Sequence, residues 1–198
     1  MTQSKIIILA AGASTRMGQA KQLLQYQGET LLNRTIRLAL EANCGAVTVV
    51  LGAKAAQIRP TITEKAITIV QNDNWQNGMS TSLQAGLNNV LHKNPKTEAI
   101  LMLLCDQPFI SVALIQSFFQ QYQIQKPSIV AAQYEDILGV PALFHQSVFP
   151  NLLQLKGQQG ARKVIRQFEK AAIAIPFPKG RFDVDTPEQY ETLKAITN

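Results

Sequence analysis

The sequence has little cysteine and lacks any apolar run long enough to cross a membrane. Its two cysteines, Cys44 and Cys105, lie in neither a metal-binding nor a redox spacing. Each lies at the edge of an apolar segment, so we expect buried thiols in a reducing, cytoplasmic compartment. The apolar runs are all shorter than the ~20 residues of a membrane helix. The N-terminal run IIILAAGA precedes Arg16 and Lys21, so we predict a strand and not a secretion signal, and we expect no membrane partner.

Charged residues make up only 16% of the chain, and the net charge of +6 comes from 19 Lys and Arg against 13 Asp and Glu. The basic residues are scattered, without a dense run interleaved with aromatic residues. Nucleic-acid binding is therefore not expected. A small anionic ligand suits this balance better, although an ordinary solvated basic surface would explain the charge equally well.

Short apolar runs alternate with segments of helical periodicity along the whole chain. The runs are continuous, as in strands that are covered on both faces of a sheet. Strands are predicted at 5–10, 46–52, 66–71, 98–105, 127–132 and 171–177. Helices are predicted at 29–43, 80–93, 111–123, 159–170 and 186–196. This order predicts one α/β domain over residues 1–198 with a mostly parallel sheet, in which ligands bind beyond the carboxyl ends of the strands.

The segment LAAGASTRMGQAK follows the first predicted strand and has the features of a phosphate-binding loop. Gly12 and Gly18 permit close backbone approach, and consecutive N–H groups can cradle phosphate oxygens. Arg16 offers a forked donor and Lys21 a compact positive charge. The segment is neither a Walker loop nor a G-x-G-x-x-G loop, so a dinucleotide-binding fold is not predicted. A glycine turn with two solvated cations is the alternative.

The third predicted strand is followed by Gly78 and a helix start that is rich in serine and threonine. We expect Gly78 and the free N–H groups of this helix start to lie at the ligand site. The helix is predicted to begin with a serine cap. An ordinary capping role is an equal alternative for Ser80 and Ser82.

Two aspartates at the same edge of the sheet could hold a divalent metal. Asp106 ends the most apolar strand, and Asp185 precedes the Thr-Pro start of a helix. Together they could form a two-carboxylate Mg²⁺ site that is completed by waters and substrate phosphates. Helix capping is the alternative role for both residues. Asp183 alternates with Asp185, and we expect it on the opposite side of this extended segment.

A paired nucleophile and base cannot be recognised in the sequence. His92 is expected to be exposed late in a helix, and His145 is expected to be structural. Acid–base and covalent mechanisms therefore lack their residues. Phosphoryl or nucleotidyl transfer needs mainly positioning, cations and a metal.

Several short motifs occur in order along the chain: LAAGASTRMGQAK, NGMSTSL, CDQP, GVP, GQQGAR and DVDTPEQ. Together they resemble the nucleotidyltransferases related to molybdenum cofactor cytidylyltransferase and guanylyltransferase, over essentially the whole chain. The resemblance implies a Rossmann-like, three-layer α/β fold. It also implies transfer of a nucleoside monophosphate from a nucleoside triphosphate to a phosphate acceptor, with Mg²⁺ as cofactor and release of pyrophosphate.

The resemblance also implies roles for the matching residues. Nucleotide binding would involve Leu9, Ala10, Ala11, Gly12, Ala13, Arg16, Lys21, Gly78 and Ser82. Arg16, Lys21 and Asp106 would be catalytic, and Asp106 and Asp185 would hold the Mg²⁺. Ala11 favours CTP, because the guanylyl branch tends to have glycine at this position. The implied partners are CTP and a phosphorylated, molybdopterin-type pterin, and the resemblance leaves room for a recipient molybdoenzyme.

Two departures from the family pattern concern the acceptor. The family often has G-H-P where this chain has Gly139-Val140-Pro141, and an acidic residue where it has Gln158. We expect both positions on the acceptor side, with the nucleotide half intact. The acceptor therefore stays open. A cytidylyl- or uridylyltransferase for another phosphorylated small molecule and a non-catalytic nucleotide- or cofactor-binding protein are the alternative functions.

Overall fold

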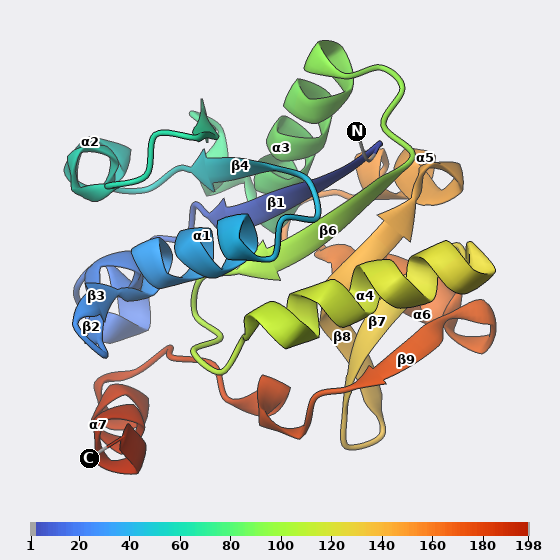
Figure 1. Cartoon of the computed structure of the whole chain (residues 1–198). Helices are drawn as coiled ribbons and strands as arrows, with labels where there is room; N and C mark the ends of the chain where they lie inside the picture. The colour runs from blue at the N-terminus through green and yellow to red at the C-terminus, as the bar shows by residue number, and fades with distance from the viewer. Residues whose placement is uncertain (1–2, 198) are drawn as a thin grey trace.

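A seven-stranded, mostly parallel sheet lies at the centre of the computed structural model, which describes residues 3–197 (Figure 1). Its strands are β1 (Ser4–Ala10), β4 (Ala46–Leu51), β5 (Ile67–Gln71), β6 (Ala99–Leu104), β7 (Ile129–Tyr134), β8 (Ile137–His145) and β9 (Ile173–Pro176). They are arranged in the order β5-β4-β1-β6-β8-β7-β9. Strand β8 is antiparallel to both of its neighbours, and the other pairs are parallel. The predicted fold class is confirmed.

Helices cover both faces of the sheet and make the structure three-layered (Figure 1). Helices α1 (Leu31–Glu41) and α4 (Val112–Gln125) lie on one face, and α3 (Met79–Lys93), α5 (Phe149–Leu153) and α6 (Ala161–Gln167) lie on the other. Two further helices are the short α2 (Ala55–Ile58) and the C-terminal α7 (Pro187–Thr197).

Strand β1 shows why its apolar run is continuous. Ile6 and Ile8 pack into the core on the α1 and α4 side, beside Ile36 of α1. Ile7 faces the other way and packs with Leu83 of α3. All of these side chains are fully buried. A strand that must fill two cores cannot alternate apolar with polar residues.

A third, smaller core joins α7 to the loop after β1. It contains side chains from the loop, from the hairpin of β2 (Gln25–Tyr26) and β3 (Glu29–Thr30), from the start of α1 and from the C-terminal segment: Met17, Leu24, Tyr26, Leu31, Val184 and Leu193. This core holds the C-terminal segment against the loop that follows β1, although the two lie far apart in the sequence (Figure 1).

The structure differs from the sequence predictions at several elements. Strand β8 was not predicted, because Gly139 and Pro141 interrupt its apolar pattern. The helix predicted from residue 29 begins at Leu31, since Thr30 belongs to β3 and its Oγ1 accepts the Asn33 N–H at 3.2 Å. The predicted serine cap of α3 is wrong: Gly78 occupies the cap position without a side-chain bond.

The helix at 159–170 is shorter than predicted, because α6 spans only Ala161–Gln167.

Among residues 3–197, no helix combines the length and the apolar character that crossing a bilayer requires.

Candidate active site

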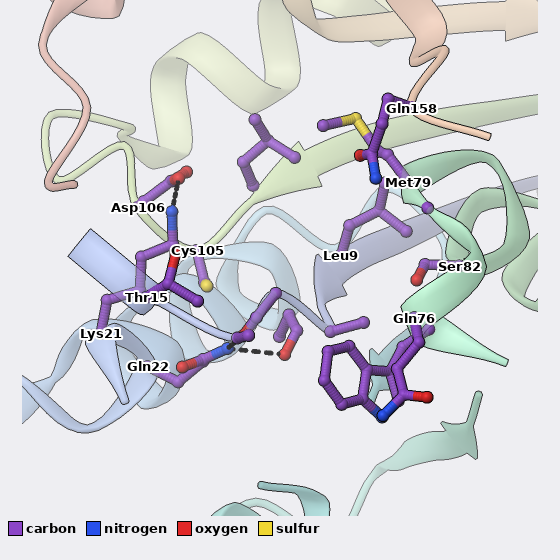
Figure 2. Close-up of a pocket in the computed structure, with 17 residues that line it drawn as sticks. Leu9, Thr15, Lys21, Gln22, Gln76, Met79, Ser82, Cys105, Asp106 and Gln158 are labelled. Carbon is purple, nitrogen blue, oxygen red and sulfur yellow. Dashed lines mark hydrogen bonds and ion pairs between the residues drawn. The ribbon is translucent and has the colours of Figure 1, made fainter. Parts of the chain in front are cut away.

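The pocket lies where parallel strands end side by side. Strands β1 and β6 are neighbours, and Leu9 pairs with Leu104 in their register. The loops that follow these two strands therefore meet at the same edge of the sheet. They line a pocket of about 400 Å³, together with the start of α3 (Figure 2).

The structure brings most of the predicted site residues to this one pocket. Its lining includes Leu9, Ala10, Ala11, Gly12, Ala13, Lys21, Gly78, Ser82 and Asp106. Arg16 and Asp185 are not part of the lining, but ion pairs connect them to Lys21 and Asp106 beside it. Among the described residues, the N–H groups of Gly12 and Ala13 donate to no protein acceptor, as a phosphate-binding loop requires.

Two cations and two carboxylates form the charged end of the pocket. The Lys21 ammonium donates to Asp106 Oδ2 (Figure 2). It also donates to Asp185 Oδ1 at 2.8 Å. The Arg16 guanidinium donates to Asp185 Oδ2 at 2.7 Å. The Lys21 and Asp106 side chains are only 15% and 12% exposed, whereas Arg16 is 70% exposed. Lys21 is therefore the central, buried member of this cluster, and Arg16 lies at its solvent side.

Charge pairing outweighs burial in this cluster. Burial lowers the pKa of Lys21, but the charge of Asp106 and the hydrogen bonds to Asp106 and Asp185 raise it by more, so its net pKa is raised. Burial also opposes the shift at Asp185, where bonds and charges from Lys21 and Arg16 lower the pKa. Lys21 and Asp185 are thus charged at neutral pH.

Backbone contacts bring Asp185 to Asp106. The Val184 N–H donates to the Asp106 carbonyl at 3.0 Å, and the Val184 side chain is fully buried in the third core. The Gln189 side chain accepts the backbone N–H groups of Asp185 and Thr186, and Ser111 caps α4. The capping alternatives for the two aspartates are therefore wrong, and both carboxylates face the cations.

Gln22 organises the loop after β1 and was missed in the sequence. Its side chain is buried, and its Nε2 donates to the Ala10 carbonyl at 2.9 Å and to the Gly12 carbonyl at 3.0 Å (Figure 2). These bonds hold the Ala10 and Gly12 carbonyls on a protein donor. A lone glutamine has no sequence signature, so only the fold reveals this role.

Ser82 and Gly78 are held by a second set of contacts. The buried side chain of Asn72 donates to Ser82 Oγ at 2.9 Å. Gly78 has a φ of 110°, and a Cβ there would lie 2.2 Å from the Gly157 carbonyl oxygen. Gln158 consequently lines the same pocket as the loop after β1. Close packing of Gly78 on Gly157 places it there. The acceptor-side role of Gln158 stays a prediction.

Val140 lies outside this lining. It is part of β8, and its carbonyl accepts Gln107 Nε2 at 3.1 Å.

Asp183 lies near the carboxylate pair, contrary to the prediction. Residues two apart in an extended segment share a side, so Asp183 is close to both Asp106 and Asp185. Burial, followed by the charges of those two aspartates, raises the pKa of Asp183 to about 7, although Lys21 and a bond with Gln107 oppose this. Asp183 Oδ1 and Gln107 Oε1 are both buried without a partner in the described structure.

The two histidines and Cys105 are not assigned a role in catalysis. His92 is exposed, as expected, and His145 Nδ1 contacts Ser147 Oγ at 2.9 Å, away from the pocket lining. Burial raises the pKa of the Cys105 thiol to about 12, so it stays protonated.

The residues that are present suit a hard divalent cation. Asp106 and Asp185 already converge on one cation, and Asp106 Oδ1 is buried without a partner in the described structure. Within residues 3–197, no cluster of three or more His, Cys, Asp or Glu side chains could hold a metal. A metal would thus depend on two carboxylates, with waters or phosphates as its other ligands, as is common for Mg²⁺.

Comparisons with known proteins agree with this geometry. Residues 6–172 match the model of the MobA-like NTP transferase domain. The PucB purine catabolism protein of Bacillus subtilis is 27% identical, over 95% of this chain and 94% of its own length. The molybdenum cofactor cytidylyltransferase of Escherichia coli is 24% identical, over 98% and 97%. The nicotine blue oxidoreductase of Paenarthrobacter nicotinovorans is 32% identical, over 81% and 80%.

A solved structure extends the likeness to three dimensions. The manganese complex of Rv0371c from Mycobacterium tuberculosis has a TM-score of 0.81 and 28% identity, and the match covers 97% of this chain and 98% of that one. A protein of the same fold has therefore been crystallised with a divalent metal.

Replacing Gln22 tests whether its amide shapes the loop. In Gln22→Glu, an oxygen would replace the nitrogen that donates to two carbonyls, so like charges would face each other. We expect the Kd for a nucleoside triphosphate to rise about tenfold, which corresponds to roughly 1.4 kcal/mol. Trp75 is the only tryptophan and lines the pocket, so its fluorescence can report binding. The exposed Gln25→Glu is the control for added charge, and equal effects of both variants would exclude the bracing role.

Asp183→Asn tests the raised pKa. Because the folded pKa of about 7 exceeds the unfolded value of 3.8, wild-type stability should fall as pH rises toward and through 7. The variant does not titrate, so its gain in unfolding free energy over wild type should grow by about 2.7 kcal/mol between pH 5 and pH 8.5. Urea unfolding in EDTA measures this. Asp136→Asn, in an exposed turn, should show no such change. A pH-independent difference for Asp183→Asn would contradict the raised pKa.

Proposed function

This chain belongs to the MobA-like NTP transferase domain family, and from that premise we propose that it transfers CMP from CTP to the phosphate of a molybdopterin-type cofactor, releasing pyrophosphate. Membership places it among the nucleotidyltransferases. The choice of cytidylyl transfer follows the name of the Escherichia coli relative, a molybdenum cofactor cytidylyltransferase. The proposal treats residues 1–198 as one catalytic domain that works in the cytoplasm, with a molybdoenzyme as the recipient of the product.

One observation carries the proposal: an Ala-Ala-Gly loop, one cation and one carboxylate line a single pocket, and a second cation and a second carboxylate are ion-paired with them beside it. The loop has free N–H groups for phosphate oxygens. The cations match the charge of a triphosphate, and the carboxylates match a hard metal ion. A non-catalytic nucleotide-binding protein would need the first two features but not the carboxylates.

The protein residues have distinct roles in the proposed reaction. The N–H groups of Gly12 and Ala13 would orient the triphosphate, while Gly78 and Ser82 would lie beside the nucleoside. An acceptor phosphate oxygen would form a bond to the α-phosphorus of CTP in line with the bond that breaks, so that pyrophosphate leaves. Arg16 and Lys21 would stabilise the charge that develops on that leaving group.

Asp106 and Asp185 would hold the divalent ion, for which we propose Mg²⁺. When bound, this ion would supply positive charge to the reacting phosphates. The manganese complex of the Mycobacterium tuberculosis protein supports a metal of this class.

A second acceptor is favoured by the position of Gln158. This residue replaces the acidic residue of the family pattern, and it lines the pocket beside Met79 and Gly78. A neutral amide there would accept an anionic group that a carboxylate would repel. Another phosphorylated small molecule is thus the alternative acceptor for cytidylyl or uridylyl transfer.

Pyrophosphate release tests the proposed reaction. The protein is incubated with CTP, GTP, UTP or ATP, with Mg²⁺ and either molybdenum cofactor or a panel of phosphorylated acceptors. We expect release with CTP and molybdenum cofactor, and a product whose mass is that of the cytidylylated acceptor. Asp106→Asn should lower kcat at least a hundredfold, which corresponds to an activation free energy that is higher by about 2.7 kcal/mol or more. Binding of CTP without release of pyrophosphate in the presence of any acceptor would overturn the proposal, and full activity of Asp106→Asn would overturn the metal assignment.

Ala11→Gly tests the choice of base. Ala11 is buried, and its Cβ packs against Gly52, where an added Cβ would lie 2.8 Å from both Ala11 Cβ and Trp75 Cβ. Removal of this methyl group would leave space beside the nucleobase. We expect the ratio of kcat/KM for CTP over GTP to fall about tenfold, the usual effect of one methyl group in a pocket. An unchanged ratio would show that Ala11 does not select the base.

A further inference from the structure

The groups proposed for the metal and the groups proposed for the triphosphate are bound to each other in this structure. Lys21 bridges Asp106 and Asp185, and Arg16 takes the second oxygen of Asp185. Of the four carboxylate oxygens, Asp106 Oδ1 alone is recorded without a partner. Asp106 and Asp185 therefore already share a cation at the place where a metal would bind.

An ammonium and a divalent metal cannot share these oxygens. Lys21 Nζ lies within hydrogen-bond distance of both carboxylates, so a metal on the same oxygens would lie within a few ångströms of another positive charge. Lys21 is also largely buried, which makes an unpaired ammonium costly. The Lys21 ammonium therefore needs another anionic partner when a metal binds between the two carboxylates.

We propose that the Lys21 ammonium occupies the metal position between Asp106 and Asp185. A divalent metal replaces it there when a triphosphate binds, and the ammonium then pairs with the phosphates. The inference rests on the proposed function, which assigns the carboxylates to the metal and the cations to the triphosphate. Metal alone would leave Lys21 unpaired, and triphosphate alone would leave the carboxylates unpaired. Only the two together pair every charge.

The exchange makes metal and nucleotide binding mutually dependent. Each ligand should strengthen the binding of the other by the same factor, because coupling between two sites is reciprocal. Arg16 contributes less, because it contacts only Asp185 and is largely exposed. Lys21 would thus serve as an internal counterion that limits metal binding to the moment when CTP is present.

The first experiment measures the affinity of the protein for the metal in the absence of nucleotide. Mn²⁺ is titrated into the full-length protein, and free Mn²⁺ is followed by electron paramagnetic resonance. Lys21→Met removes the competing charge, so we expect Mn²⁺ to bind about tenfold more tightly than in wild type, a coupling within the usual range. Arg16→Gln is the matched control, since it removes the same charge but keeps the Lys21 bridge, and it should change the affinity less than about threefold.

The second experiment measures the affinity of the protein for CTP in the absence of metal. CTP is titrated in EDTA at pH 8.5, and the fluorescence of Trp75 is followed. Asp106→Asn releases one contact of Lys21, so we expect metal-free CTP to bind about fivefold more tightly. Asp183→Asn is the control, because it removes a neighbouring carboxylate that has no ion pair with Lys21.

Two results would overturn the exchange: Mn²⁺ that binds Lys21→Met no more tightly than wild type, or equal effects of each variant and its matched control. Because the two titrations need no turnover, they separate this inference from the reaction. If they succeed while CTP releases no pyrophosphate with any acceptor, the reaction is wrong and the exchange stands. If pyrophosphate is released but Lys21→Met binds Mn²⁺ like wild type, the reaction stands and the exchange is wrong.

Discussion

The bridge that Lys21 makes between Asp106 and Asp185 is the interaction on which the rest of the site depends. It joins the loop after β1, the end of β6 and the segment before α7, which are separated by 85 and 164 positions along the chain. A partly buried pair of carboxylates would be unstable without such a cation. The same three groups also carry the charges that a triphosphate and a metal require. The interaction that assembles the pocket is thus also the one that ligand binding must rearrange.

The sheet makes this bridge geometrically simple. Strands β1 and β6 are parallel neighbours, so Lys21 and Asp106 need only short loops to meet. Asp185 arrives by a different route, because the bond from Val184 N–H to the Asp106 carbonyl fixes the C-terminal segment beside β6. The small core around Met17 and Val184 then secures this segment to the cation-bearing loop. Apolar packing outside the pocket thereby controls the spacing of the charges inside it.

The sequence predicted the parts of the site that follow from strand ends and missed those that follow from tertiary contacts. Arg16, Lys21, Asp106 and Asp185 were recognisable because each follows an apolar strand or precedes a helix in a spacing that suits phosphate and metal chemistry. Gln22 and Asn72 were not, because a buried amide that braces a loop leaves no periodic signal. Strand β8 was hidden by Gly139 and Pro141. The position of Gln158 depends on the contact between Gly78 and Gly157, which no local pattern encodes.

A crystal structure of the protein with CTP and Mn²⁺ would show directly whether the metal replaces Lys21. We expect the anomalous signal of Mn²⁺ between Asp106 and Asp185, where Lys21 Nζ lies in the present structure, and the Lys21 ammonium on a phosphate oxygen. Base and ribose should lie beside Ala11, Gly78 and Ser82. A complex in which CTP fills the pocket while Lys21 still bridges the two carboxylates, with Mn²⁺ bound elsewhere, would rule out the exchange of Lys21 for the metal.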